Sequence, residues 1–360
     1  MKKILIFANA SGYGGAEVSI ELLIKYWKNK YSLLVLVENE ELFSSLTNMN
    51  KELSIIKLSK GNSLVAWIEN ILLTRKMIKK FKPEFFLTNT NKGALLLAIM
   101  SILLPIEKEK CIVYVRDFQW KFKKIIFFIL KKAIVAVPTM ATLYYSNSGY
   151  INNELIIETY DPMNIKDDDI CDGTTKESTR YIVALANISR WKGIHLLLIA
   201  YKKSGLYNDG VSLRIYGKIA DKEYYDELNE YVKKEGLSGK VIFYSFTDNV
   251  NNIYKNACLV VNTSISKYGG PETLGRTIIE GWNFKKPVLA FKTGGAKCII
   301  DDGVNGCLIP EEDTDAFAEK MIEITKNEEM AKRMGDNGYQ KVKKFFSIES
   351  VSNSIEYYIR

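Results

Sequence analysis

Two glutamates, Glu272 and Glu280, stand eight positions apart in the segment 268–282, behind a Gly-Gly-Pro turn. Another pair with the same spacing, Glu227 and Glu235, falls in a polar segment that is typical of a solvated helix face. The stretch between Glu272 and Glu280 is apolar enough to be buried, and buried carboxylates need partners. If this stretch is helical throughout, the two acids lie about 12 Å apart along its axis.

A ligand can be matched to this spacing. The N–H groups of Thr273 and Leu274 would lie between the two acids, at a helix start that favours an anion. A molecule with hydroxyl groups at both ends and phosphates in the middle would contact all three features. A nucleotide-diphosphate sugar is such a molecule, so we expect Glu272 to hold sugar hydroxyls and Glu280 the ribose.

Two further segments could bind phosphate. The segment 11–17, "SGYGGAE", follows an apolar run, and its glycines would let backbone N–H groups approach an anion. Its spacing is not that of a dinucleotide fingerprint, so a plain tight turn is an equal alternative. The second segment, 190–193, "RWKG", opens a helical pattern where Lys192 could neutralise phosphate oxygens or be a solvated charge.

The elements that must position these residues are predicted from apolar runs of strand length that alternate with helical segments. This alternation is typical of parallel sheets covered on both faces. The predicted strands are 3–8, 33–37, 53–58, 84–87, 111–115 and 133–137 in the first half, and 181–185, 212–216, 240–244, 258–261, 287–290 and 306–309 in the second.

A polar, acidic stretch rich in turn formers, residues 160–180, separates the two halves. A chain of 360 residues also favours two domains. We therefore expect α/β structure in two doubly wound domains, 1–165 and 166–346, with a terminal helix in 347–360 that packs back toward the first. Such domains would bind a ligand in a cleft at the carboxyl ends of their sheets.

Composition excludes several classes of protein and site. Five widely spaced cysteines without a C-x-x-C favour reduced thiols and a cytoplasmic location. The longest apolar run, 93–105, is shorter than the roughly 20 residues of a spanning helix. A single histidine, His195, excludes a multi-histidine metal site. The aspartate clusters 167–169 and 301–302 fall in a linker and a turn, so no metal site is predicted.

Positive charge and aromatic residues gather in the segment 120–132, which holds five lysines and four aromatic residues. Such stretches can lie in a bilayer interface, attracted by anionic lipid. We predict membrane contact for Trp120, Lys121, Lys123 and Lys124. The alternative is a helix whose aromatic face packs into the core while its lysines are solvated. No nucleic-acid-binding module accompanies the charge, so a nucleic-acid partner is not expected.

Taken together, the chain resembles the retaining GT-B glycosyltransferases that carry the E-x7-E motif, glycosyltransferase family 4. The resemblance covers nearly the full length and rests on "GYGGAE", "SRWKG", "LRIYGK", "GPETLGRTIIEG" and "KPVLAFKTGGAKCIIDDGVNGCLIP". It implies a GT-B fold of two Rossmann-like domains that face a central cleft. It also implies a nucleotide-sugar donor, no metal and no separate cofactor.

The resemblance further implies a glycan or lipid-linked acceptor in the assembly of a bacterial surface polysaccharide. The protein would then work in the cytoplasm or at the inner face of the cell membrane. By this resemblance Lys192 contacts the donor pyrophosphate, and Gly14 and Gly15 approach the sugar phosphate from the first domain. The implied donor-binding residues are Gly14, Gly15, Asn187, Arg190, Lys192, Gly217, Thr273, Leu274 and Glu280.

At two places the chain departs from the family pattern. Where the family often has Gly-Arg, this chain has Ala186-Asn187, so we expect Arg190 to replace the usual diphosphate arginine. Where the family has His-Asp, this chain has Arg116-Asp117. Arg116 could stabilise the leaving phosphate and Asp117 could orient the acceptor hydroxyl, as catalytic residues beside Glu272. The alternative is a structural salt bridge between them.

Two other functions use the same donor contacts. A nucleotide-sugar epimerase of GT-B fold would need acid-base residues for proton transfer at the sugar, and the scarcity of histidine disfavours it. A non-catalytic binding protein would keep the site without turnover. Product analysis with mixed donors would separate these alternatives from a transferase.

Overall fold

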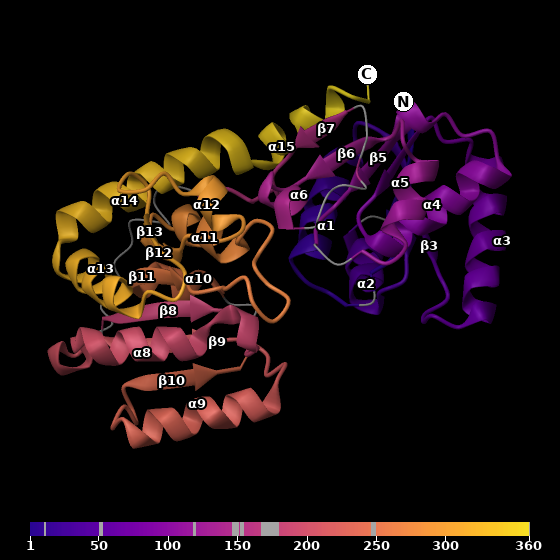
Figure 1. The fold of residues 1–360 in the computed structure, drawn as a ribbon. Coiled ribbons are helices and arrows are strands. Elements are labelled where there is room, and N and C mark those ends of the chain that lie inside the picture. Colours follow the sequence, from indigo (N-terminus) through magenta and orange to yellow (C-terminus); the bar gives the residue numbers. More distant parts are fainter. Residues whose placement is uncertain are drawn as a thin grey trace. The chain divides into compact units, whose positions relative to one another are not determined.

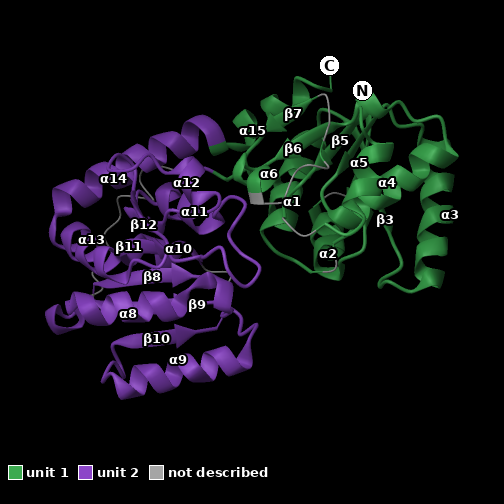
Figure 2. Ribbon diagram, viewed as in Figure 1, with its two compact units in different colours: residues 1–164, 346–360 green, residues 165–345 purple. Residues whose placement is uncertain are grey.

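The computed structural model describes residues 1–10, 12–49, 53–117, 120–145, 151, 155–166, 180–245 and 250–359. The chain forms two compact units (Figure 2): unit 1 comprises Met1–Asn164 and Phe346–Arg360, and unit 2 comprises Ile165–Phe345. Cys171 and the aspartate cluster 167–169 lie outside the described residues. The other four cysteines are free thiols.

Unit 1 is built on a parallel sheet of seven strands within its described residues, in the order β3-β2-β1-β4-β5-β6-β7 (Figure 1). The strands are β1 Lys3–Ala8, β2 Ser32–Val37, β3 Ser54–Lys57, β4 Phe85–Thr88, β5 Cys111–Tyr114, β6 Ile134–Val137 and β7 Ile156–Glu158. The helices are α1 Gly15–Trp27, α2 Glu40–Met49, α3 Leu64–Phe81, α4 Asn91–Leu103, α5 Lys123–Ile129, α6 Ala141–Tyr145 and α15 Ile348–Glu356.

Each face of this sheet is covered by a different set of helices. On one face, α3, α4 and α5 pack on side chains such as Phe7, Phe86 and Val113. On the other face, α1, α2 and α15 pack on side chains such as Ile6 and Val35. Burial on both faces explains why the strands inside the sheet, β2, β1, β4, β5 and β6, are almost entirely apolar in sequence.

Helix α15 completes the core of unit 1 although it comes from the end of the chain. Val351 and Ile355 join the apolar cluster that holds α1. The indole N–H of Trp27 donates to the hydroxyl of Ser352 at 2.6 Å, and both side chains are buried. The two chain ends therefore belong to one unit.

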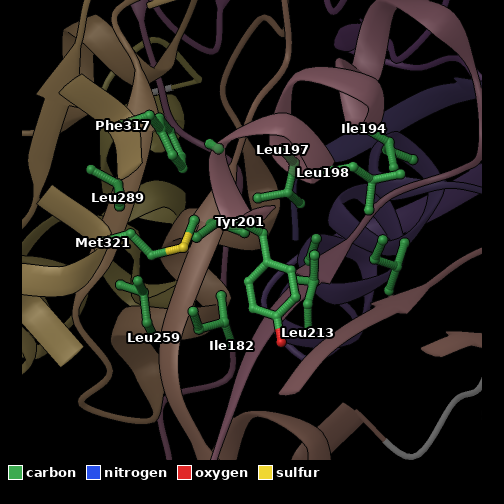
Figure 3. Packing of buried hydrophobic residues seen from close by; sticks show 14 of the residues in the cluster. Ile182, Ile194, Leu197, Leu198, Tyr201, Leu213, Leu259, Leu289, Phe317 and Met321 are labelled. Atoms are coloured by element: carbon green, nitrogen blue, oxygen red, sulfur yellow. The ribbon is translucent and has the colours of Figure 1, made fainter. Parts of the chain in front are cut away.

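Unit 2 has a parallel sheet in the order β10-β9-β8-β11-β12-β13. The strands are β8 Tyr181–Leu185, β9 Ser212–Tyr216, β10 Val241–Tyr244, β11 Ala257–Asn262, β12 Val288–Phe291 and β13 Cys307–Ile309. The helices are α8 Ile194–Ser204, α9 Lys222–Lys234, α10 Val250–Asn256, α11 Arg276–Asn283, α12 Ala296–Ile299, α13 Thr314–Lys326 and α14 Glu328–Lys341. Figure 3 shows the core on one face, to which Tyr201 of α8, Met321 of α13 and Leu259 of β11 all contribute.

Every predicted strand is present, and its ends lie within one residue of the prediction. The sequence analysis missed β7, because its three residues are too short to stand out as an apolar run. The helix after β1 begins at Gly15, where the Glu17 carboxylate accepts a hydrogen bond from the N–H of Gly14. No helix within the described residues is both long and apolar enough to cross a bilayer.

Candidate functional site

The candidate site in unit 2 lies where the strand order of the sheet reverses. Strands β8 and β11 are neighbours, and the connections that leave their carboxyl ends lead to helices on opposite faces. Parallel α/β sheets bind ligands at such reversal points. Lys192 follows β8 and Glu272 follows β11. The sheet topology therefore brings together two residues that are 80 positions apart in sequence.

The carboxylate of Glu272 is held by three donors. The ammonium of Lys192 lies 2.7 Å from its Oε1, the hydroxyl of Ser264 2.8 Å, and the amide nitrogen of Asn262 3.1 Å. Of the hydrogen-bond donors that the described residues provide, none contacts Oε2 of Glu272. That oxygen is the group through which the side chain can accept a further hydrogen bond.

Electrostatics keep this carboxylate ionised. Burial raises the pKa of Glu272, but the Lys192 ammonium and the hydrogen bonds from Ser264 and Asn262 lower it by more. The net result is a pKa below the ordinary value of 4.5. The Lys192 side chain is 13% exposed and that of Glu272 16%, so solvent screens the pair only partly. At neutral pH the site presents a carboxylate and an ammonium side by side.

Glycines allow the loop after β11 to approach the turn that carries Lys192. Gly193 has a φ of +62°, and a Cβ there would lie 2.1 Å from the carbonyl oxygen of Thr263. A Cβ on Gly270 would lie 2.0 Å from the carbonyl oxygen of Ile265. Two hydrogen bonds join the segments: Ile265 N–H to Trp191 O at 2.8 Å, and Thr263 Oγ1 to Lys192 O at 3.0 Å.

The segment 293–295, "TGG", follows β12 and fixes the loop of Glu272 from the other side. The N–H of Gly295 donates to the carbonyl of Glu272 at 2.7 Å, and a Cβ on Gly295 would lie 2.4 Å from Cα of Leu274. The hydroxyl of Thr293 donates to the carbonyl of Ser264 at 3.0 Å. This segment therefore fixes the backbone on both sides of the glutamate.

Glu280 lies on α11 with both of its carboxylate oxygens engaged. Arg276 donates to Oε1 at 3.0 Å and the Tyr254 hydroxyl to Oε2 at 2.9 Å. The expected continuous helix between the two glutamates is wrong, because α11 begins at Arg276 and residues 272–275 form a loop. Thr273 and Leu274 therefore precede the helix, and the axial separation of about 12 Å does not apply.

Other predicted donor residues of unit 2 lie along the same edge of the sheet. Asn187, in the loop after β8, accepts a hydrogen bond from the N–H of Lys218 at 3.4 Å. Gly217 follows β9, and a Cβ there would lie 2.0 Å from the carbonyl oxygen of Ala186. The contact between the loops after β8 and β9 therefore requires a glycine at position 217, because any larger residue would clash with Ala186.

The guanidinium of Arg190 points to α9 rather than to Glu272. It donates to both carboxylate oxygens of Glu227, at 2.9 and 2.5 Å, and lies 3.7 Å from Asp221. Its carbon lies 5.1 Å from the centre of the Tyr224 ring. Glu227 is 49% exposed, as expected for the pair of glutamates on a solvated helix. In this structure Arg190 is not part of the Lys192–Glu272 cluster.

In unit 1, Gly14 and Gly15 lie at the start of α1, which follows β1. The N–H of Gly14 donates to the carboxylate of the buried Glu17 at 3.0 Å. Unit 1 has its own strand reversal, between β1 and β4, and these glycines follow the first of these strands. Their predicted contact with a sugar phosphate stays a prediction.

Arg116 follows β5 and forms an ion pair with Asp161, with the guanidinium stacked 3.8 Å from the centre of the Tyr114 ring. Both charged side chains are largely buried, at 7% and 12% exposed. Asp117 is exposed. The structure therefore assigns Arg116 a salt bridge that connects β5 to the segment after β7, and its partner is Asp161.

The predicted membrane contact of Trp120 is wrong. Its side chain is buried and stacks on Phe127 with 5.5 Å between ring centres. The ring belongs to the apolar core on this face of the sheet, so it is unavailable to lipid. Lys121 and Lys124 are exposed, and Lys123 is partly exposed.

Sequence reasoning missed the side chains that hold the two glutamates. Asn262 and Ser264 fix Glu272, and Tyr254 and Arg276 fix Glu280. The available signal for the first pair was the run Asn-Thr-Ser directly after a buried strand, where polar side chains gather at the carboxyl edge of a sheet. Within the described residues there is no group of three or more His, Cys, Asp or Glu side chains that could hold a metal ion.

Comparison with known proteins extends this description. Residues 166–341, within unit 2, match the family described as glycosyl transferases group 1. An uncharacterized glycosyltransferase of Methanocaldococcus jannaschii is 32% identical over 128 residues, 35% of each chain. The O-antigen chain mannosyltransferase C of Escherichia coli is 29% identical over 160 residues, 44% of this chain and 40% of that protein. The chain thus spans well under half the length of these curated relatives.

Solved structures match over the whole chain. HepE of Anabaena in complex with UDP and glucose has a TM-score of 0.83 and 19% identity, and the match covers 100% of this chain and 99% of that one. The lipopolysaccharide outer core galactosyltransferase WaaB, in its apo form, has a TM-score of 0.74 and 16% identity over 100% and 99%. These structures are GT-B glycosyltransferases. The fold of the present chain is GT-B.

Proposed function

We propose that this protein is a glycosyltransferase that transfers a sugar from a nucleotide-diphosphate sugar to a hydroxyl group of an acceptor. The observation that carries the proposal is the ionised pair of Lys192 and Glu272 at the strand reversal of unit 2. The family match over residues 166–341 supports it, since it covers the unit that contains this pair. The complex of HepE with UDP and glucose supports the class of donor.

Each residue of the pair has a distinct task in this proposal. Transfer leaves negative charge on the departing diphosphate, and the Lys192 ammonium would stabilise that charge. Glu272 would accept a hydrogen bond from a sugar hydroxyl through Oε2, while Lys192, Ser264 and Asn262 hold Oε1. A carboxylate kept ionised beside the reacting carbon would also favour the positive charge that develops on the sugar ring.

We propose that the donor site also includes Glu280, Thr273, Leu274, Asn187 and Gly217. Glu280 would contact the ribose, since a carboxylate that already accepts two hydrogen bonds has lone pairs left for more. Arg190 would reach the diphosphate only by leaving Glu227. Arg116 and Asp117 of unit 1, with Gly14 and Gly15, remain the proposed contacts of the leaving group and acceptor.

The acceptor is proposed to be a glycan or a lipid-linked glycan of a cell-surface polysaccharide. Support comes from the relatives' names, which include an O-antigen mannosyltransferase and a lipopolysaccharide core glycosyltransferase. We propose that transfer retains the anomeric configuration. The resemblance to family 4 supports this, as does the name of a relative, the poly(ribitol-phosphate) alpha-N-acetylglucosaminyltransferase of Staphylococcus aureus. We also propose that Lys192 supplies the cationic charge for the diphosphate without a metal ion.

The test compares Glu272→Gln and Lys192→Ala with the unmodified protein, in donor hydrolysis and transfer assays with UDP-glucose and a panel of other nucleotide sugars. Both variants should lower kcat/KM at least about 100-fold, the usual effect of removing a group that stabilises transition-state charge. The matched control is Glu319→Gln, an exposed glutamate eight positions after Glu311, which should leave kcat/KM unchanged. Near-normal turnover in both site variants would remove the assignment.

The same assay distinguishes the other functions. Proton NMR of the product reports the anomeric configuration, and an inverted product would contradict retention. Activity that a chelator abolishes would contradict metal independence. Isomerisation of the donor without transfer would indicate an epimerase, and a thermal shift with UDP but no turnover of any donor would indicate a binding protein.

A further inference from the structure

A glutamate outside the candidate site, Glu311, contacts the loop of Glu272. This loop comprises residues 263–275, between β11 and α11. The N–H of Ser266 donates to Oε1 of Glu311 at 2.5 Å, and the hydroxyl of Ser266 donates to Oε2 at 2.8 Å. Glu311 follows β13, the last strand in the order of the unit 2 sheet, and is partly buried. One carboxylate therefore holds both donors of a single loop residue.

Ser266 is connected to Glu272 through the residues just before it. The hydroxyl of Ser264 donates to Oε1 of Glu272 at 2.8 Å. Between the two serines, the N–H of Ile265 donates to the carbonyl of Trp191 at 2.8 Å. Since only one residue separates the serines, a displacement of Ser266 moves the hydroxyl that orients the Glu272 carboxylate.

After Ser266 the chain returns to Glu272 through a tight turn, residues 267–270. A backbone hydrogen bond of 3.1 Å between the ends of this turn closes it. Within the turn, Tyr268 has a φ of +57°, a left-handed conformation that is unfavourable for residues other than glycine. The turn is therefore strained, and the bonds to Glu311 fix the chain at the point where the turn begins.

The neighbouring Glu312 also contacts the loop, but through an exposed ion pair. Its carboxylate lies 2.7 Å from the ammonium of Lys267, and the two side chains are 40% and 63% exposed. Exposed pairs of this kind contribute little to the free energy of folding. The two bonds from Ser266 to Glu311 are stronger, because both have a charged acceptor that is only partly in water. Glu311 is therefore the residue after β13 that fixes the loop.

We infer that Glu311 is a positioning residue, which holds the loop through Ser266 so that the Glu272 carboxylate can meet the donor sugar. The inference rests on the proposed function, in which Glu272 contacts a sugar hydroxyl. The turn of Lys192 has a separate anchor, because the Lys192 carbonyl accepts a hydrogen bond from Thr263 at 3.0 Å. Loss of Glu311 should therefore impair the sugar part of the donor site and leave the UDP part intact.

The experiment compares Glu311→Ala and Glu311→Gln in transfer and donor hydrolysis assays with UDP-glucose and the panel of nucleotide sugars. Glu311→Ala should lower kcat at least about tenfold, because misplacing a catalytic group by about 1 Å costs up to about 100-fold. Glu311→Gln should restore most of kcat, since its amide oxygen accepts the N–H of Ser266 and its amide nitrogen donates to the hydroxyl. The inhibition constant of UDP should stay unchanged, and so should kcat in the neighbouring control Glu312→Ala.

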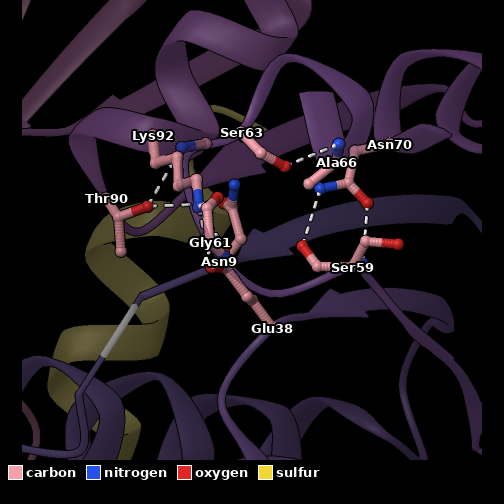
Figure 4. Close-up of polar contacts among 10 residues, drawn as sticks. Asn9, Glu38, Ser59, Gly61, Ser63, Ala66, Asn70, Thr90 and Lys92 are labelled. Atoms are coloured by element: carbon pink, nitrogen blue, oxygen red, sulfur yellow. Dashed lines mark hydrogen bonds and ion pairs between the residues drawn. The ribbon is translucent and has the colours of Figure 1, made fainter. Parts of the chain in front are cut away.

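A second comparison pairs Ser266 with a serine of unit 1 that is held in the same way. Ser59 follows β3, the last strand in the order of that sheet, and its N–H donates to Asn70 at 2.8 Å (Figure 4). Its hydroxyl donates to Glu69 at 2.7 Å. Ser266→Ala should lower kcat and Ser59→Ala should not. This pair decides the question if circular dichroism shows that Glu311→Ala is unfolded.

Hydrogen exchange gives a readout that does not depend on turnover. In Glu311→Ala, exchange should accelerate at Ile265 and Gly295, whose N–H groups form backbone bonds on the two sides of the loop of Glu272. Neither bond includes Glu311, so faster exchange there reports a displacement of the whole loop. A merely local role would change exchange at Ser266 alone and would contradict the inference.

Three further outcomes would overturn it. Glu311→Ala could keep the kcat of the unmodified protein, or Glu311→Gln or Glu312→Ala could lose as much activity as Glu311→Ala. The inhibition constant of UDP could also rise as much as kcat falls. Normal turnover by Glu311→Ala beside an impaired Glu272→Gln would remove the positioning role and keep the proposed function. Normal turnover by Glu272→Gln would remove both.

Discussion

Single residues in the candidate site are defined by their partners more than by their own type. Glu272 and Glu280 are both glutamates on the same segment, yet one is paired with a lysine from a distant loop and the other with an arginine one turn away. The first has an oxygen, Oε2, that no donor among the described residues contacts, while both oxygens of the second accept hydrogen bonds. Glu272 is therefore the glutamate of the two with an oxygen open to a further hydrogen bond.

His195 gives a prediction at the residue scale, because it is the only histidine of the chain. Its backbone N–H donates to the hydroxyl of Tyr224 at 2.9 Å, and that hydroxyl lies 2.7 Å from its Nδ1. A hydroxyl that donates to Nδ1 requires the neutral ring. Burial, with a smaller contribution from Arg190, lowers the pKa of His195 below 6.5, and Glu312 opposes this shift.

The sign of the effect on stability follows from this direction. The folded state binds a proton on His195 less tightly than the unfolded state does. The neutral His195 ring therefore contributes to the free energy of unfolding above about pH 6.5, and this contribution is lost as pH falls below that value. The melting temperature should therefore decrease between about pH 7.5 and pH 5.5. In His195→Gln the decrease should be smaller. An equal decrease in the variant, measured by circular dichroism, would show that another group titrates.

At the scale of elements, the site depends on loops that pack against each other without side chains between them. The turn that carries Lys192, the loop of Glu272 and the "TGG" segment meet through Gly193, Gly270 and Gly295. The motifs that stand out in the sequence are therefore partly packing motifs. Their glycines set the distance between the strand ends, and this distance decides whether Lys192 can reach Glu272.

Gly193 and Gly205 provide a matched test, since they flank the two ends of α8 with φ values of +62° and +65°. Gly205→Ala should cost about 1 kcal/mol, the price of a left-handed conformation for alanine, because its nearest neighbour is 3.8 Å away. Gly193→Ala should cost at least twice as much, since its Cβ would meet the carbonyl of Thr263 at 2.1 Å.

Urea denaturation measures both free energies of unfolding, and UDP affinity gives a second readout. Gly193→Ala should weaken UDP binding, because the turn must move away from the loop of Glu272. Gly205→Ala should not. Equal costs for the two substitutions would mean that the close contact at Gly193 relaxes without consequence.

At the scale of the whole molecule, the chain forms unit 1, then unit 2, and returns to unit 1 through α15. The returning helix is part of the core of unit 1 rather than an appendage. Val351, Ile355 and Ile359 are buried against α1 and the sheet, and the ammonium of Lys2 donates to the carbonyl of Ile359 at 2.9 Å. The stability of unit 1 should therefore depend on the last residues of the chain.

Ile355→Ala tests this dependence. The side chain is fully buried, so its truncation should cost about 2–5 kcal/mol. Hydrogen exchange should accelerate in β1, β2 and α1 of unit 1 and stay unchanged in the strands of unit 2. The control is Tyr357→Ala, where the side chain is 67% exposed and the cost should be within about 0.5 kcal/mol. Equal exchange in unit 1 for both variants would contradict the role given to α15.

The sequence by itself determined the strands of both sheets, apart from the short β7, because strands buried on both faces must be apolar along their length. It also singled out Lys192 and Glu272 as candidate site residues. Only the tertiary structure decided that they form an ion pair, that Arg190 turns to α9 instead, and that Trp120 is buried. These contacts join segments far apart in the chain, and the order of strands in a sheet, which local patterns do not encode, brings such segments together.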